Sequence, residues 1–97
     1  MTVTVFNATF AKATGETIAG SISWDKYTPR RLDAKLCPHI SDCEVDYPIW
    51  TVRGANTRAG MEALVAKMQQ KAKAMKLTCT EEAETKYAPK ETSSRQN

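Results

Sequence analysis

The strongest structural signal in the sequence is a stripe of apolar residues at helical spacing between residues 57 and 76. Apolar positions recur there at intervals of three and four, and lysines occupy positions between them. This spacing predicts an amphipathic helix whose apolar side packs on another element, with Asn56 or Thr57 as the N-cap. The lysines near its C-terminal end also suit the helix dipole. The apolar stripe consists of Met61, Leu64, Val65, Met68, Ala72 and Met75.

A helix of this kind needs a surface to cover, and the first part of the chain predicts one. Residues 2–10 are rich in β-forming residues, and residues 17–24 alternate apolar side chains with serine and threonine. The short glycine-containing stretch 12–16 can turn the chain between them. The two segments are therefore predicted to form a hairpin. The apolar face of its second strand comprises Ile18, Ile22 and Trp24.

Residues 29–36 are predicted to form a short second helix. Thr28 can accept a hydrogen bond as its N-cap, and Pro29 suits the first helical position, where the missing N–H has no intrahelical partner. Pro38 then limits continuation of the helix.

The remaining segments are less regular. Further strands are expected at 43–47 and 49–53, and the intervening Pro48 implies an edge or a break, since it cannot donate to a ladder. Gly54 is expected to make the turn into the long helix. Residues 77–87 are compatible with either strand or helix, because an alternating start is followed by three glutamates.

A chain of 97 residues forms one domain, because a second core could not be filled. The predicted class is α+β: an antiparallel sheet of three to four strands with the long helix packed on it and a short second helix. Residues 1–87 form the domain and residues 88–97 a mobile tail. The sequence has neither a membrane-length apolar run nor the pattern of a signal peptide. Its three cysteines are expected to be reduced, as in a cytosolic protein.

A zinc site is one interpretation of the cysteines and the single histidine. Together they could supply a closed tetrahedral set of three thiolates and one imidazole. The spacing lacks the C-x2-C and H-x3-H pairs of established zinc modules, so no metal or other cofactor is predicted and buried thiols are the simpler interpretation. The ligands of this alternative would be Cys37, His39, Cys43 and Cys79.

An acidic row is the preferred candidate for partner contact. If residues 42–47 are extended, Asp42, Glu44 and Asp46 project from one face at intervals of roughly 6.6–7 Å, twice the strand rise. That interval is close to the separation of phosphates along a nucleic-acid strand. Such a row could occupy a cationic groove that is built for DNA. The simpler alternative is a solvated strand face.

A basic and aromatic set offers an alternative, direct nucleic-acid contact. Its cations could hold phosphates and its aromatic rings could stack on bases. Interrupting aspartates and a net charge of only +3 argue against a dedicated nucleic-acid binder. The set comprises Trp24, Tyr27, Arg30, Arg31 and Lys35.

Catalysis is not expected. The sequence contains no paired acid and base, no phosphate-binding loop and no nucleophile motif. The stretch from 52 to 60 has two glycines before a helix but lacks both the G-x-G-x-x-G pattern and the P-loop lysine. The chain is therefore predicted to be a binding protein with no small-molecule substrate and no membrane partner.

The chain resembles small inhibitors encoded by phages and mobile elements, in particular the anti-CRISPR proteins directed at the type I-F surveillance complex. The resemblance lies in its length and in "IWTVRGANTRAGMEALVAKMQQKAKAMK", a strand, a turn and an apolar-striped helix. This stretch covers under a third of the chain.

The resemblance implies a non-enzymatic inhibitor acting in the host cytoplasm. Its partner would be the protein–RNA surveillance complex, at the subunits that bind DNA, and it would block target DNA by local DNA mimicry. Asp42, Glu44 and Asp46 would make the contact. A net charge of +3 departs from the strongly acidic character of wholesale DNA mimics, so mimicry would be local. Secondary contact candidates are Asp25, Asp33 and Glu16.

Overall fold

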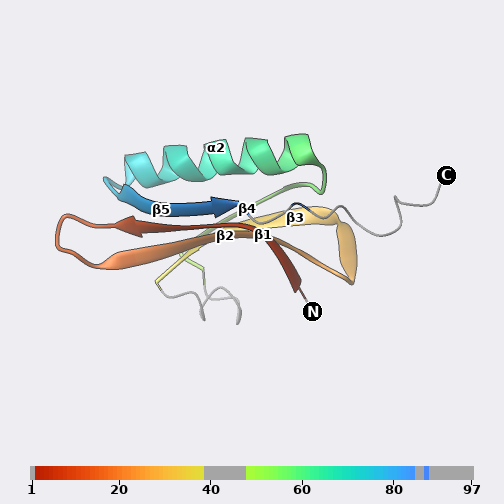
Figure 1. The fold of residues 1–97 in the computed structure, drawn as a ribbon, viewed down its shortest axis with the longest axis horizontal. Coiled ribbons are helices and arrows are strands. Elements are labelled where there is room, and N and C mark those ends of the chain that lie inside the picture. The colour runs from red at the N-terminus through yellow and green to blue at the C-terminus, as the bar shows by residue number, and fades with distance from the viewer. Residues whose placement is uncertain (1, 39–47, 85–86, 88–97) are drawn as a thin grey trace.

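The computed structural model describes residues 2–38, 48–84 and 87. In these residues a five-stranded antiparallel sheet carries one helix against one of its faces (Figure 1). The predicted α+β class is confirmed, but the sheet has five strands where three to four were expected. The elements are β1 (Thr2–Ala11), β2 (Thr17–Asp25), β3 (Thr28–Cys37), β4 (Trp50–Ala55), α2 (Arg58–Ala74) and β5 (Thr78–Glu84).

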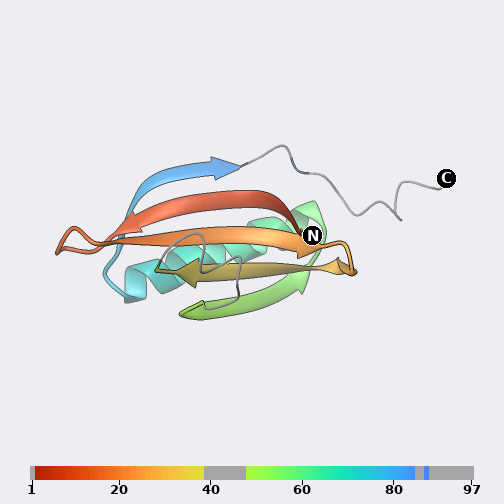
Figure 2. The same cartoon turned by 90° about the horizontal axis from the view of Figure 1, so that it is seen from below.

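The strands lie in the order β4-β3-β2-β1-β5 (Figure 2). Strands β4 and β5 are therefore the two edges, and the chain passes from one edge to the other through α2. Every neighbouring pair is antiparallel. Because four antiparallel pairings separate β4 from β5, these two edge strands point in the same direction.

The predicted hairpin of the first two strands is confirmed. Strand β1 pairs with β2 along its whole length, with one irregularity between Thr4 and Phe6. That irregularity explains why simple alternation breaks down near this point of the sequence. In the connecting turn, the Gly15 N–H donates to the Lys12 carbonyl, and Gly15 has a φ of 96°, a conformation that favours glycine.

The short helix predicted at 29–36 is wrong, because these residues belong to strand β3. Leu32, Ala34 and Leu36 are fully buried and alternate with more exposed neighbours, as one face of a strand requires. Pro29 is tolerated because it has no register partner in either neighbouring strand, so no ladder hydrogen bond needs its missing N–H. The two-residue period of buried side chains in this segment is a stronger signal than the helix-capping pattern of Thr28 and Pro29 at its start.

The predicted long helix is confirmed as α2, with Thr57 as its N-cap. The Thr57 hydroxyl accepts a hydrogen bond from the Gly60 N–H at 2.9 Å. The buried residues of α2 are four members of the predicted stripe, so its apolar side faces the sheet as expected. They are Met61, Leu64, Met68 and Ala72.

Glycines let the helix approach the sheet closely. A Cβ at Gly20 would come within 2.7 Å of the Met68 Sδ, and a Cβ at Gly54 would come within 3.2 Å of Leu64 carbons. Gly54 was expected to make a turn, but it lies inside strand β4. Its role is therefore to leave room for the helix above it.

Residues 77–87, ambiguous in sequence, contain edge strand β5. The chain leaves α2 through Lys76, which has a φ of 60°, and the Leu77 N–H donates to the Ala72 carbonyl. All seven residues of β5 are exposed. Further along, Tyr87 packs against the core and its hydroxyl donates to Asn56 Oδ1 at 2.6 Å.

The core lies between α2 and the helix-facing side of the sheet. Within the described part of the chain, no helix has the length and apolar character needed to cross a membrane. The strand predicted at 43–47 and the tail at 88–97 lie outside the described residues. The buried apolar residues are Val5, Phe6, Ala8, Phe10, Ile18, Ile22, Trp24, Leu32, Ala34, Leu36, Met61, Leu64, Met68, Ala72 and Leu77.

Candidate functional site

Basic side chains gather on the face of the sheet that α2 does not cover. On β3, Leu36 packs toward the helix, so Arg31 and Lys35, an odd number of residues away, lie on the opposite face. On β4, Gly54 faces the helix, which places Arg53 on the uncovered face as well. We call Arg31, Lys35 and Arg53 the basic sheet face.

One carboxylate organises this basic sheet face. Asp33 pairs in register with Arg53 across the β3–β4 ladder. Its Oδ1 lies 3.3 Å from the Arg31 Nε and 3.4 Å from the Arg53 Nε. The Arg31 Nε is shielded from solvent and forms no hydrogen bond, so this contact is electrostatic. Two guanidinium groups are thereby held around a single carboxylate.

The basic sheet face keeps a positive balance. Two arginines contact the one carboxylate of Asp33, and the Arg53 side chain remains 65% exposed while that of Asp33 is 17% exposed. Guanidinium groups fixed in this way lose less rotamer freedom when a second anion arrives. Hydroxyl groups lie next to them, because Ser23 pairs with Asp33 and Thr51 pairs with Lys35. Cations with neighbouring hydroxyl donors are the groups that contact phosphates and sugars.

The predicted basic and aromatic set is only partly brought together. Trp24 is 4% exposed and belongs to the core, so it cannot stack on a base. Tyr27 is 86% exposed in the β2–β3 turn, where its N–H donates to Asp25 Oδ1 at 2.7 Å. Arg30 is exposed near that turn, whereas Arg31 and Lys35 belong to the basic sheet face.

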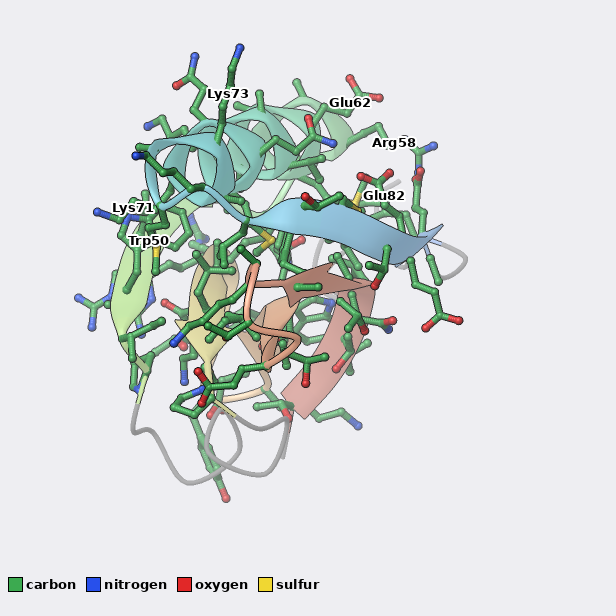
Figure 3. All side chains as sticks on the ribbon, turned by 90° about the vertical axis from the view of Figure 1, so that its left-hand side faces the viewer. Trp50, Arg58, Glu62, Lys71, Lys73 and Glu82 are labelled. Carbon is green, nitrogen blue, oxygen red and sulfur yellow. The ribbon has the colours of Figure 1, made fainter. Side chains whose placement is uncertain are left out.

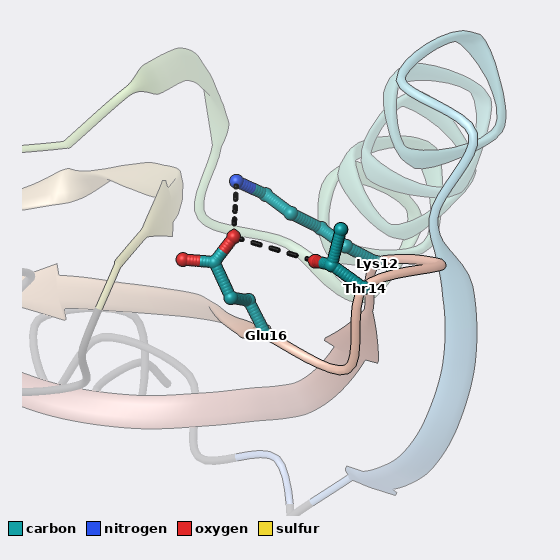
Figure 4. A network of polar contacts seen from close by, with 3 residues as sticks. All are labelled: Lys12, Thr14 and Glu16. Carbon is teal, nitrogen blue, oxygen red and sulfur yellow. Dashed lines mark hydrogen bonds and ion pairs between the residues drawn. The ribbon is translucent and has the colours of Figure 1, made fainter.

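The secondary acidic candidates are scattered and already engaged. Glu16 immediately precedes β2, and Asp25 is the last residue of that strand. Glu16 forms an ion pair with Lys12 at 3.5 Å and accepts a hydrogen bond from the Thr14 hydroxyl (Figure 4). Asp33 is neutralised by its two arginines. These three residues therefore do not form an acidic surface. The preferred acidic row, Asp42, Glu44 and Asp46, lies outside the described residues.

The cysteines do not support the zinc alternative. Cys37 is buried and disulfide-bonded, so it is not available as a thiolate ligand, and the expectation of three reduced cysteines is wrong at this position. Cys79 is free and exposed on edge strand β5. His39 and Cys43 lie outside the described residues. Within the described ranges, no three residues of metal-ligand type come together.

Cys79 also has the wrong environment for a nucleophile. Desolvation, the nearby Glu82 carboxylate and a hydrogen bond to that carboxylate all raise the pKa of the Cys79 thiol. The Sγ lies 3.7 Å from Glu82 Oε2. A raised pKa keeps the thiol protonated at neutral pH, and the thiolate is the reactive form.

Sequence reasoning missed an acidic edge. Glu81, Glu82 and Glu84 are exposed on β5. Glu82 accepts a hydrogen bond from Gln69 at 2.9 Å, and Glu84 pairs with Arg58 at 2.6 Å, so both lean toward α2. If residues 78–84 had been assigned as a strand, the two-residue alternation of side chains would have placed Glu82 and Glu84 on one face and Glu81 on the other.

Charge is thus distributed unevenly across the sheet. Carboxylates collect at the β5 edge, whereas cations collect on β3, on β4 and along the adjoining side of α2. Figure 3 shows this division, with Lys71 above Trp50 on the β4 side and Glu82 with Arg58 on the β5 side. Lys73 points away from the sheet.

Comparisons of the chain with protein-family models, with curated proteins and with solved structures found no match.

Proposed function

We propose that this chain is a non-enzymatic binding domain that contacts the phosphate backbone of a single-stranded nucleic acid through its basic sheet face. The observation that carries the proposal is the pair of arginines, Arg31 and Arg53, held around the single carboxylate of Asp33, with Lys35 on the same face of β3. Phosphate contacts supply most of the sequence-independent affinity of nucleic-acid binders.

The geometry favours an extended strand over a compact anion. Arg31 and Lys35 lie four residues apart on β3, a separation of roughly 13 Å. One small anion cannot bridge that distance, but successive phosphates of one strand can contact both ends. Tyr27, exposed in the β2–β3 turn, offers a ring on which a base could stack.

The test is the fluorescence anisotropy of labelled single-stranded RNA and DNA titrated with the protein at several salt concentrations. We expect the double variant Lys35→Gln/Arg53→Gln to bind more weakly and to reduce the salt slope by about 0.7 for each lost phosphate contact. The matched control is Lys67→Gln/Lys73→Gln, which removes the same charge from α2. An equal loss of affinity in both variants would reject the basic sheet face as the site.

A second proposal is inhibition of the type I-F surveillance complex in the host cytoplasm, as the resemblance implies. The glutamates of β5 support this proposal. Glu82 and Glu84 project from one side of an exposed strand and are two residues apart, which is the spacing expected of carboxylates that imitate the phosphates of DNA. Asp42, Glu44 and Asp46 stay candidates for the same contact.

Target-DNA binding by the purified surveillance complex, measured with and without the protein, tests this second proposal. Loss of DNA binding is expected with the wild type and not with Asp42→Lys/Glu44→Lys/Asp46→Lys. A parallel Glu82→Lys/Glu84→Lys variant assigns the contact to one acidic segment or the other. Undiminished DNA binding in the presence of excess wild-type protein would exclude inhibition, whatever the result with free nucleic acid.

A further inference from the structure

Both edges of the sheet are open along the described residues, because β4 and β5 each pair with a neighbour on one side only. Open edges present backbone N–H and C=O groups to other strands, and proteins often block them with charge. The charges at these two edges have opposite signs. This difference determines which partner each edge can accept.

The β5 edge is acidic on the side that faces the helix. Glu82 and Glu84 share that side, and both lean toward α2. Glu84 is paired with Arg58, whereas Glu82 is bonded to the neutral Gln69 and, among the described residues, keeps its charge uncompensated. Glu81 adds a third carboxylate to the opposite face of the same strand. Two copies of β5 placed side by side would bring like charges together.

The β4 edge is basic on the corresponding side. Lys71 lies above Trp50 (Figure 3), and Lys67, one turn earlier, lies on the same side of α2. Among the described residues, neither lysine forms an ion pair within its own chain. Two copies of β4 would therefore also repel each other.

The ladders place the opposite charges at matching levels of the sheet. Glu82 is at the level of Trp50, because the intervening pairs connect them through Ala8, Gly20 and Leu36. If a second copy continued the sheet at the same level, its Glu82 would lie beside Trp50 and near Lys71.

The same alignment holds two residues further along. Glu84 is at the level of Val52, through Phe6, Ile22 and Ala34. Helix α2 follows β4 directly and returns along it, so Lys67 lies one turn beyond Lys71 in the direction of Val52 (Figure 1). The two glutamates of one copy thus match the two lysines of another. Strands β4 and β5 point the same way, so the new pair would be parallel.

We propose that this chain associates with copies of itself head to tail, the β5 edge of one copy against the β4 edge of the next. The interface is heterologous, because different surfaces of the two copies meet. Each copy in such an assembly still offers one free edge of each kind. The assembly is therefore open-ended rather than a closed dimer.

Sedimentation velocity over a concentration series tests the proposal, at low ionic strength, where the Debye length exceeds ~10 Å. The wild type is expected to show an average mass that rises with concentration and falls again when salt is added. A wild type that stays monomeric throughout the series would overturn the proposal. This measurement uses the unaltered protein, so it does not depend on the folding of any variant.

Two charge-reversal variants determine the geometry. Lys67→Glu/Lys71→Glu makes the β4 edge acidic, and Glu82→Lys/Glu84→Lys makes the β5 edge basic. In each variant the two edges then carry like charges, so each variant alone is expected to be monomeric. An equimolar mixture is expected to regain concentration-dependent growth, since a glutamate edge then meets a lysine edge at both kinds of junction between the two variants. No association in the mixture, while circular dichroism shows both variants folded, contradicts head-to-tail contact.

A matched control removes the same positive charge elsewhere. Lys26→Glu/Lys73→Glu changes the β2–β3 turn and the outward side of α2 and is expected to associate like the wild type. If this control becomes monomeric as well, net charge rather than the β4 edge governs association, and the proposed interface is rejected.

Discussion

Helix α2 contacts the two sides of the sheet in different ways. Over β2, β3 and β4 it buries apolar side chains, and Gly20 of β2 and Gly54 of β4 let the backbones come close. Toward β5 it is joined by polar contacts, from Gln69 to Glu82 and from Arg58 to Glu84. Close apolar packing resists change, whereas exposed polar contacts exchange readily with water. The β4 side should therefore set the stability of the domain, and the β5 side should tolerate change.

The largest effect is expected from Leu64→Ala on the β4 side. Leu64 is 1% exposed and covers Gly54, so truncation leaves a cavity where helix and sheet meet. We expect a loss of about 2–5 kcal/mol in the free energy of unfolding, measured by urea denaturation. Thr78→Ala on β5 is the matched comparison, expected within about 0.5 kcal/mol of the wild type. Similar losses in the two variants would contradict the difference between the sides.

Gly60→Ala comes next and tests the close approach at the start of α2. A Cβ at this position would overlap the Ala55 carbonyl oxygen, which is backbone and cannot turn aside. The first turn of the helix must shift, at a cost of about 1–3 kcal/mol. Thermal unfolding followed by circular dichroism measures it. Unchanged stability would show that the helix start is free to move relative to β4.

Tyr87→Phe tests the polar contact between the chain after β5 and Asn56, the residue after β4, and should cost less, about 1 kcal/mol. The variant removes the hydroxyl that donates to Asn56 Oδ1, while Asn56 Nδ2 keeps its hydrogen bond to the Pro29 carbonyl. Chemical denaturation gives the difference. Desolvation raises the pKa of the Tyr87 hydroxyl, with the Arg58 charge acting in the opposite direction.

The pKa shift of Tyr87 gives this prediction a pH dependence. A raised pKa means that the folded state holds the phenol proton more tightly than the unfolded state does. The stabilisation is complete below the ordinary tyrosine pKa of about 10 and is lost as pH rises through the folded pKa. Stability of the wild type should therefore fall more steeply in this alkaline range than that of Tyr87→Phe. Parallel pH profiles would exclude this contribution of Tyr87.

The smallest effect is expected from Glu84→Gln. The Arg58–Glu84 pair is short at 2.6 Å, but both side chains are largely exposed, which limits its contribution to at most about 1 kcal/mol. Hydrogen exchange is the more sensitive readout, since faster exchange confined to β5 is expected without a change in β2 or β3. A global loss of protection would instead place the β5 side within the main cooperative unit.

The same contrast explains how much of the fold the sequence predicted. The hairpin and α2 were predicted because their apolar residues recur at one clear period. Strand β3 was assigned as helix because Thr28 and Pro29 are residues that commonly begin a helix. The apolar residues Leu32, Ala34 and Leu36 nevertheless recur with the two-residue period of a strand. Strand β5 stayed ambiguous because none of its residues is buried, so no apolar period marks it.

The candidate site was less predictable for a physical reason. Arg53 joined Arg31 and Asp33 through strand register, which depends on pairing between segments far apart in the sequence. Trp24 was placed in the alternative binding set because an aromatic ring beside cations suits both a core and a stacking surface. The two-residue period that puts Trp24 on the apolar face with Ile18 and Ile22 was the signal that could have excluded it, since all three are buried.

The position of β1 has a consequence for the order of assembly. Strand β1 is second to last in the sheet, between β2, which follows it after a short turn, and β5, the last described strand in the sequence. During synthesis on the ribosome, β1 can pair at once with β2 but must wait for α2 and β5 before its other side is covered. Contacts of long sequence separation form slowly. The nascent four-stranded sheet would therefore pass through a stage with Phe6, Ala8 and Phe10 beside an unpaired edge, when chaperones would have most to bind.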